Sequence, residues 1–152
     1  MNASSTDTTV SAAQTALCFM RAFWDGNLAD AEEYLTADAT WVFQPSMPYV
    51  AEDGPVWPAR EAMRRIVADL FGAFDDASPF KVTVTNSFGD ATQAVLEYRA
   101  EGRVIGGEPY TSRYAACFTV RDSKVAEVRP YNDTKHMFAM LGGEPRKVIG
   151  LG

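Results

Sequence analysis

The side chains best suited to chemistry lie in the C-terminal half of the chain, on segments with strand-like alternation. Glu97 and Arg99 are two positions apart, so they share one face of a strand and lie close enough to pair. If that face lines a dry pocket, Glu97 is a candidate general base and Arg99 a candidate donor to developing negative charge. The alternation leaves a second placement open, in water or at a subunit interface, because the opposite face of this strand is more apolar.

Three further residues complete the candidate catalytic set. Tyr114 shares a face with small neighbours, and a buried phenol there donates either to a substrate carbonyl or to the backbone. Asn132 is expected where the last strand meets a final helix, as a helix cap, a pocket group or both. His136, the only histidine, titrates near neutrality, so it is an alternative base or else a surface or subunit-contact residue. Asp133 is interpreted as a cap or as a partner of Arg129, rather than as a base.

Aromatic residues predict the walls of a pocket. Two of them alternate on one face of a strand predicted over residues 39–44, and two more follow in a proline-rich stretch over 45–58 that has no regular period. We interpret this stretch as an irregular loop over the pocket, where burial is not otherwise demanded; plain core packing is the alternative. The candidate substrate-binding residues are Trp41, Phe43, Tyr49, Trp57, Ser112 and Phe118.

Hydrophobic periodicity predicts the elements that position these residues. A capping-box pattern at Ser11 and Gln14 opens a first helix that ends near Gly26, and a second, shorter helix follows. A third helix after Pro58 carries an apolar stripe as far as Phe74. From residue 80 the period changes to two, with turns at 89–90 and 121–124, before a short helix ends the domain. The order α-α-β-α-β-β-β-β-α predicts an α+β fold with a largely antiparallel sheet and helices on one face.

Composition limits the classes of partner. The 152 residues, 47% of them hydrophobic, suit one domain over 11–142, with a disordered leader at 1–10 and a tail at 143–152. A net charge of -6 argues against binding to nucleic acid or anionic lipid, since both need clustered cations. No apolar run reaches the roughly 18 residues of a membrane span, and no signal peptide is evident, so we expect a cytoplasmic protein.

Cysteine and histidine usage argues against a metal centre. Cys18 and Cys117 are predicted to be small buried residues, without a disulfide between them. With one histidine and no Cys-x-x-Cys motif, a protein-built zinc site is not expected, and we predict no metal and no cofactor.

Two segments carry a family resemblance: PAREAMRRIVADLF at the third helix, and TSRYAACFTVRDSKVAEVRPYNDTKH from the fourth strand of the sheet to the last helix. Together with the element order, they resemble the NTF2-like fold, specifically the SnoaL-like polyketide cyclase and ketosteroid isomerase-like group. The resemblance covers about residues 12–142. It implies a cone, in which a curved, mostly antiparallel sheet wraps around the N-terminal helices and a short C-terminal helix follows.

The same resemblance implies a range of activities. Members include isomerases, cyclases, epoxide hydrolases, dehydratases, cofactor-free lyases and non-catalytic binding or association domains. Epoxide hydrolases of this group carry an Arg-x-Asp pair where this chain has Glu97 and Arg99, and an acid where it has Pro130. These differences disfavour epoxide hydrolysis.

The sequence therefore predicts a cofactor-independent enzyme that acts on a hydrophobic, ring-containing molecule, aromatic or polycyclic. It would move a proton next to a carbonyl or hydroxyl group, as an isomerase, cyclase or eliminating lyase. The alternatives are a cofactor-free lyase that cleaves lignin-type aromatic dimers and a non-catalytic binding or association domain. A homodimer or homotrimer is expected in each case.

Overall fold

The structure is a computed structural model that describes residues 11–75 and 80–141. The predicted leader at 1–10 and the predicted tail at 143–152 lie outside the described residues. None of the described helices combines the length and the apolar character that crossing a bilayer requires.

Two capped helices open the domain, as the sequence predicts. Helix α1 (Ala12–Trp24) begins at a capping box, in which Ser11 Oγ accepts from the amide of Gln14 and the Gln14 side chain accepts from the amide of Ser11. Helix α2 (Leu28–Glu33) is capped by Asn27. Cys18 lies off the buried stripe of α1 and is exposed, so its predicted burial is wrong.

The stretch after the first strand is more regular than predicted. Strand β1 (Leu35–Val42) begins earlier than expected, and the segment predicted to be an irregular loop contains helix α3 (Val50–Asp53) and strand β2 (Val56–Pro58). Strand β2 pairs antiparallel with β1, with Trp57 opposite Trp41. Proline is tolerated in β2 because β2 is an edge strand. On its open side no neighbouring strand needs the amide hydrogen that proline lacks.

Helix α4 (Ala59–Asp69) ends sooner than its apolar stripe predicts. Leu70 is its C-cap, a 3-10 turn η2 (Phe71–Ala73) follows, and Phe74 is extended. The backbone of Phe74 forms an isolated antiparallel β-bridge with Val104, and this pairing explains why Phe74 is not helical. Its side chain remains buried all the same.

Four long strands and a final helix complete the domain: β3 (Lys81–Gly89), β4 (Gln93–Arg103), β5 (Pro109–Arg121), β6 (Lys124–Asn132) and α5 (Thr134–Leu141). The sheet order is β2-β1-β6-β5-β4-β3, and only the β1–β6 pair is parallel among the described strands. Asp122 and Ser123 adopt positive φ at the predicted β5–β6 turn.

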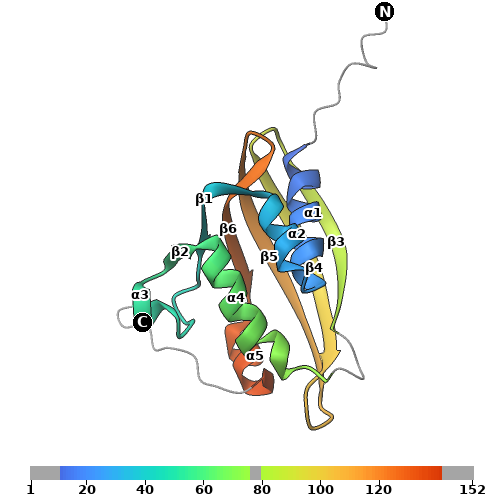
Figure 1. Cartoon of the computed structure of the whole chain (residues 1–152). Helices are drawn as coiled ribbons and strands as arrows, with labels where there is room; N and C mark the ends of the chain where they lie inside the picture. The colour runs from blue at the N-terminus through green and yellow to red at the C-terminus, as the bar shows by residue number, and fades with distance from the viewer. Residues whose placement is uncertain (1–10, 76–79, 142–152) are drawn as a thin grey trace, which may run out of the picture.

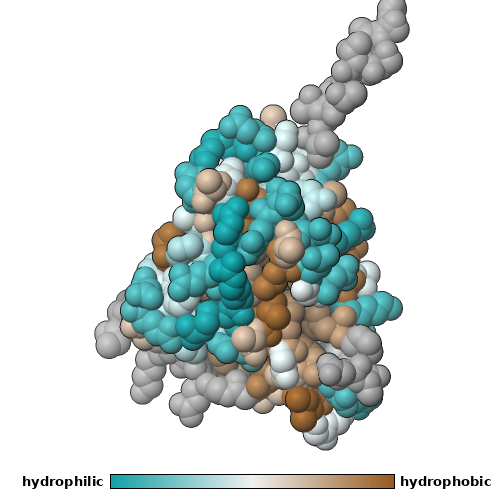
Figure 2. Space-filling model, viewed as in Figure 1, coloured by the Kyte–Doolittle hydropathy of each residue, from teal (hydrophilic) through white to brown (hydrophobic). Residues whose placement is uncertain are grey.

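The helices cover one face of the curved sheet, with α4 and α5 near the end where β4 and β5 meet in a hairpin (Figure 1). The predicted α+β class is confirmed, and the predicted order of elements holds except for α3, β2 and the turn η2, which were not predicted. Figure 2 shows a largely hydrophilic helical side, with hydrophobic residues gathered beside α4 and toward its C-terminal end. The interior between sheet and helices holds the core and, at this end, the site described next.

Candidate functional site

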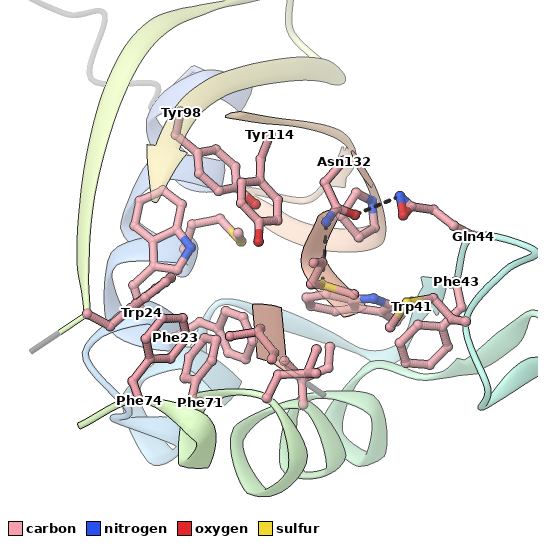
Figure 3. A pocket seen from close by; sticks show the side chains of 18 residues that line it. Phe23, Trp24, Trp41, Phe43, Gln44, Phe71, Phe74, Tyr98, Tyr114 and Asn132 are labelled. Carbon is pink, nitrogen blue, oxygen red and sulfur yellow. Dashed lines mark hydrogen bonds between the residues drawn. The ribbon is translucent and has the colours of Figure 1, made fainter. Parts of the chain in front are cut away.

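A cavity of about 90 Å³ lies between the sheet and the helices. Its walls are mostly aromatic and aliphatic, and they come from α1, β1, the segment from α4 to β3, and α5 (Figure 3). The main apolar contributors are Met20, Phe23, Trp41, Phe43, Ile66 and Phe71. Apolar walls that surround an open volume suit a hydrophobic guest, because it leaves water without losing hydrogen bonds.

Polar groups gather at one part of the cavity because three strands place them in one row. Tyr98 on β4 pairs with Tyr114 on β5, and Tyr114 pairs with Asn132 on β6. Gln44, just after β1, extends the row, since its Nε2 donates to Asn132 Oδ1 at 3.0 Å. Asn132 Nδ2 lies 3.4 Å from the sulfur of Met137 (Figure 3). All five residues line the cavity.

Tyr114 makes the shortest hydrogen bond of this row. Its hydroxyl lies 2.6 Å from that of Tyr110, and its ring stacks on Tyr98 at 5.1 Å with the planes 3° apart. Burial raises the pKa of Tyr114 above its ordinary value, and the neighbouring Tyr110 raises it further, while Asn132 acts in the opposite direction. Tyr114 is therefore a neutral phenol that can donate to a guest oxygen.

Burial also governs the two tyrosines beside it. It raises the pKa of Tyr98, to which the charge of Tyr110 adds. It raises that of Tyr110 as well, against the opposing effect of its hydrogen bond with Tyr114. The two hydroxyls form a hydrogen bond with their oxygens 2.6 Å apart, and either hydroxyl can be the donor. Tyr110 thereby positions Tyr114 without lining the cavity itself.

Glu97 and Arg99 are not part of this site. Both are exposed on the face of β4 opposite Leu96 and Tyr98, which are the buried residues. Arg99 pairs with Glu101 at 2.9 Å, while Glu97 accepts from Asn86 at 3.1 Å. The pocket placement of this pair is corrected, since the more apolar face of the strand turned inward. The alternative that the sequence left open, exposure on the outer face, describes their position.

His136 also lies outside the cavity lining. Its Nε2 is 2.9 Å from the carbonyl oxygen of Thr111, and its ring stacks on Tyr110 at 5.5 Å. Asp133 caps α5, because its Oδ1 accepts from the amide of His136. Asn132, which the sequence allowed as cap or pocket group, lines the cavity, and Arg129 pairs with Glu127 rather than with Asp133.

The predicted substrate-binding residues divide into two groups. Trp41 and Phe43 line the cavity. Tyr49 and Trp57 are buried one layer behind, where each packs against Phe43 at 4.9 and 5.5 Å. The loop aromatics thus support the wall rather than form it.

Ser112 and Phe118 are buried core residues outside the lining. Ser112 hydrogen-bonds to Tyr110, and Phe118 packs edge-on against Phe19 at 6.5 Å. Their face of β5 was predicted correctly, but the cavity opens only around Tyr114, in the middle of that face. Phe118 is opposite Val128 and Ala94, farther along the sheet, where the layers are in contact.

Several lining residues were not predicted as site residues, among them Trp24, Gln44, Phe71, Phe74 and Tyr98. Tyr98 could have been predicted from the sequence, since it lies on the apolar face of β4 and a buried phenol needs a hydrogen-bond partner. Gln44 carries none, because its role depends on the 3.0 Å contact with a residue 88 positions away. A second, more open hollow lies on the other side of Trp24 and Phe80, where Arg21 and Asp25 border it.

The lining contains no Asp, Glu, His, Lys or Arg among the described residues. What it offers is hydrogen bonding from two phenols and two amides within apolar walls. No group of three or more His, Cys, Asp or Glu residues in the described part of the chain is arranged to hold a metal ion. The arrangement can bind an uncharged ring and polarise an oxygen on it.

Comparison with known proteins assigns the family. The sequence profile of the SnoaL-like domain matches residues 17–128, which is most of the chain. The chain belongs to the SnoaL-like family. No curated protein matches the sequence.

Solved structures agree with this fold. The SnoaL-like chain superposes on TerC, co-crystallized with polyporic acid, with a TM-score of 0.68 and 14% identity over 85% of this chain and 96% of TerC. An NTF2-like protein from Burkholderia thailandensis E264 gives 0.68 and 15% over 89% and 100%. A protein with a ketosteroid isomerase-like fold from Catenulispora acidiphila DSM 44928, in complex with trimethylamine, gives 0.63 and 17% over 88% and 95%. These identities establish a shared fold; the chemistry must be argued from the site.

Proposed function

We propose that this SnoaL-like protein binds a hydrophobic, ring-containing small molecule in the cavity and acts on it without a cofactor. In this proposal, the Tyr114 hydroxyl donates to an oxygen of the guest, and Asn132 and Gln44 orient it. The observation that carries the proposal is the neutral phenol of Tyr114, paired with Tyr110 at 2.6 Å, within a cavity whose walls are mainly apolar. A donor held in a dry site stabilises negative charge that develops on oxygen.

Isomerisation, cyclisation and elimination next to a carbonyl all pass through such a charge. Tyr114 is suited to this step because its hydrogen bond with Tyr110 fixes the hydroxyl and burial keeps the proton on it. A bond to a developing oxyanion is stronger than one to the ground-state carbonyl, so the contact favours the transition state.

The lining described above bears no carboxylate or imidazole, so neither Glu97 nor His136 is placed to act as a general base on a guest in the cavity. The proposed contribution is electrophilic: the site polarises the oxygen, and the proton leaves to water or to a basic group of the substrate. This favours substrates whose reacting hydrogen is already acidic. The same feature favours the second candidate, a binding domain without catalysis, because a missing base limits the chemistry but does not limit affinity.

A panel of steroids, polycyclic quinones and diaryl compounds would test the proposal. Ligands that raise the melting temperature are followed by turnover assays, since binding to the folded state alone stabilises it. For a converted ligand, Tyr114→Phe should lower kcat by about 10²- to 10³-fold, the usual effect of removing one oxyanion donor.

Tyr131→Phe serves as the matched control, because Tyr131 is 52% exposed on the outer face of the sheet. It should leave turnover unchanged. Full turnover by folded Tyr114→Phe would contradict the catalytic proposal. Binding that depends on Tyr114, without conversion of any ligand, would favour the binding domain.

The homodimer or homotrimer stays a prediction, proposed to form through the outer face of the sheet. That face combines small, half-buried side chains at Ala115 and Cys117 with the exposed Tyr131. The charged side chains of β4, among them Arg99 and Glu101, border these residues. In a symmetric dimer, acidic groups on this face of one copy would therefore contact basic groups on the same face of the other.

A further inference from the structure

The phenol of Tyr98 is buried in the cavity wall, and no residue in the described part of the chain accepts its hydrogen. Tyr98 is 6% exposed, lies on the inner face of β4 and lines the cavity. The indole of Trp24 acts on its oxygen as a weak donor and thereby lowers its pKa. An indole has a hydrogen to give and no lone pair to offer, so the hydrogen of Tyr98 remains unused.

The Tyr98 hydroxyl has surface that is open to the cavity. Among residues 11–75 and 80–141, Nε1 of Trp41 is the one side-chain nitrogen or oxygen that is both enclosed and without a hydrogen bond of ordinary length. The Tyr98 hydroxyl forms no such bond either, so it is not enclosed. Figure 3 shows its phenol projecting from the sheet into the cavity. Since a buried phenol needs a partner, a molecule that fills the cavity can supply the missing acceptor.

Tyr114 presents a second hydroxyl beside that of Tyr98. The two residues are directly opposite on β4 and β5, and their rings stack with the centroids 5.1 Å apart and the planes 3° apart. Side chains at paired positions leave the sheet side by side, which places the two hydroxyls about 5 Å apart. When Tyr110 supplies the hydrogen of its 2.6 Å bond to Tyr114, the hydrogen of Tyr114 is free as well.

This spacing suits a single acceptor atom. An oxygen that accepts from two hydroxyls at about 2.8 Å each, one at each lone pair, holds those donors about 4.5–5 Å apart. We propose that Tyr98 and Tyr114 donate together to one carbonyl oxygen of the bound molecule. The inference rests on the proposed function, to which it adds Tyr98 as a second residue in contact with the reacting oxygen. It also narrows the substrate class to an uncharged ring that bears a ketone or quinone carbonyl.

A probe with a single oxygen tests whether the two donors share it. Acetophenone and cumene are single rings of similar shape, in which acetophenone carries a carbonyl oxygen where cumene carries a methyl group. Since acetophenone has one acceptor atom, donors that both act on it must meet at that atom. Calorimetry with the full-length protein measures affinity. The infrared carbonyl stretch of 13C-labelled acetophenone measures the hydrogen bonds themselves, because each bond lowers its frequency.

Tyr98→Phe and Tyr114→Phe should each weaken acetophenone binding by about 2- to 10-fold, the range for one neutral hydrogen bond, and leave cumene binding unchanged. Each should also raise the carbonyl frequency of bound acetophenone, and the double variant should raise it furthest. Tyr49→Phe is the matched control, because Tyr49 is a buried phenol behind the wall, bonded to Asp69 at 2.8 Å. It should lower the melting temperature and leave the carbonyl frequency unchanged.

The outcomes separate the two proposals. An unchanged affinity and carbonyl frequency in Tyr98→Phe, with both changed in Tyr114→Phe, would overturn the inference and leave the proposed function intact. Equal weakening of acetophenone and cumene binding by Tyr98→Phe would also overturn it, because Tyr98 would then only shape the cavity. Failure of both probes to bind, or an acetophenone complex that Tyr114→Phe does not alter, would contradict the proposed function and the inference with it.

Discussion

Alkaline pH should unfold this protein steeply, because four phenols are buried as neutral groups. Burial is the largest cause of a raised pKa at each of them, and at Tyr49 the hydrogen bond to Asp69 at 2.8 Å adds to it. The four are Tyr49, Tyr98, Tyr110 and Tyr114. Three of them surround the polar row of the cavity, so their protonation reports directly on the candidate site.

The sign follows from proton binding. A phenol in the unfolded chain titrates near pH 10, and the folded state keeps its proton to higher pH. Its stabilising contribution is therefore fully present below about pH 10 and is lost as pH rises through the folded pKa. Between its unfolded and its folded pKa, each such group costs about 1.4 kcal/mol per pH unit, so the three with the largest shifts, Tyr49, Tyr98 and Tyr114, together cost about 4 kcal/mol per unit. Since domains of this size are stable by about 5–15 kcal/mol, unfolding is expected within about one to four units above pH 10.

Urea unfolding at pH 8 to 12 would measure this slope, while ultraviolet absorbance counts the phenolates that appear together with unfolding. Lysines titrate in the same range, so the comparison between variants is decisive. Tyr114→Phe should reduce the slope by about 1.4 kcal/mol per pH unit, shared with its coupled partner Tyr110. Phe71→Leu, a lining change without a titrating group, should lower stability at every pH and keep the slope. A slope that Tyr114→Phe leaves unchanged would refute the reasoning.

Two further changes test how the cavity wall is supported. Gly102→Ala should lower the free energy of unfolding by about 1–3 kcal/mol, because the added Cβ would lie 2.6 Å from a ring carbon of Phe74. Gly72→Ala is the control, since its Cβ would meet only a backbone oxygen at 4.0 Å. Equal urea midpoints for the two variants would contradict this packing. Arg65→Met should cost about 1–2 kcal/mol in low salt and less in 1 M salt, since it removes two exposed ion pairs and a cation over two aromatic rings. Arg64→Met, which breaks one exposed pair, should cost less than Arg65→Met in the same urea titration, and the reverse order would show that Arg65 does not hold the wall.

The sequence was sufficient for the fold because local rules and long-range pairing agree. Ser11 with Gln14 begins α1, and period-two alternation from residue 80 places each strand. It was not sufficient between residues 45 and 58, where four prolines removed the periodic signal. There the pairing of Trp57 with Trp41 decides the conformation, and no local pattern encodes that contact.

Alternation also explains which site residues could be predicted. It places Tyr114 and Asn132 correctly, because each lies on a strand with one clearly apolar face. On β4 the same rule leaves two faces that could turn inward. The catalytic argument favoured the face with Glu97, whereas the apolar character of its neighbours favoured the face with Tyr98, which is the buried one. Desolvation decides such a conflict, since an unpaired carboxylate costs far more to bury than a phenol that finds a partner.

The absence of charge in the described lining sets the selectivity of the site. A carboxylate guest would lose its hydration without meeting a cation there, which is costly in a dry cavity. A plain hydrocarbon would fill the volume but offer no acceptor to the Tyr114 hydroxyl. Sites built to hydrogen-bond a guest reject analogues that lack the bonding atom far more strongly than they reject a change of one methylene. Among the rings that a cavity of about 90 Å³ admits, the pattern of oxygens should therefore decide which molecule this protein accepts.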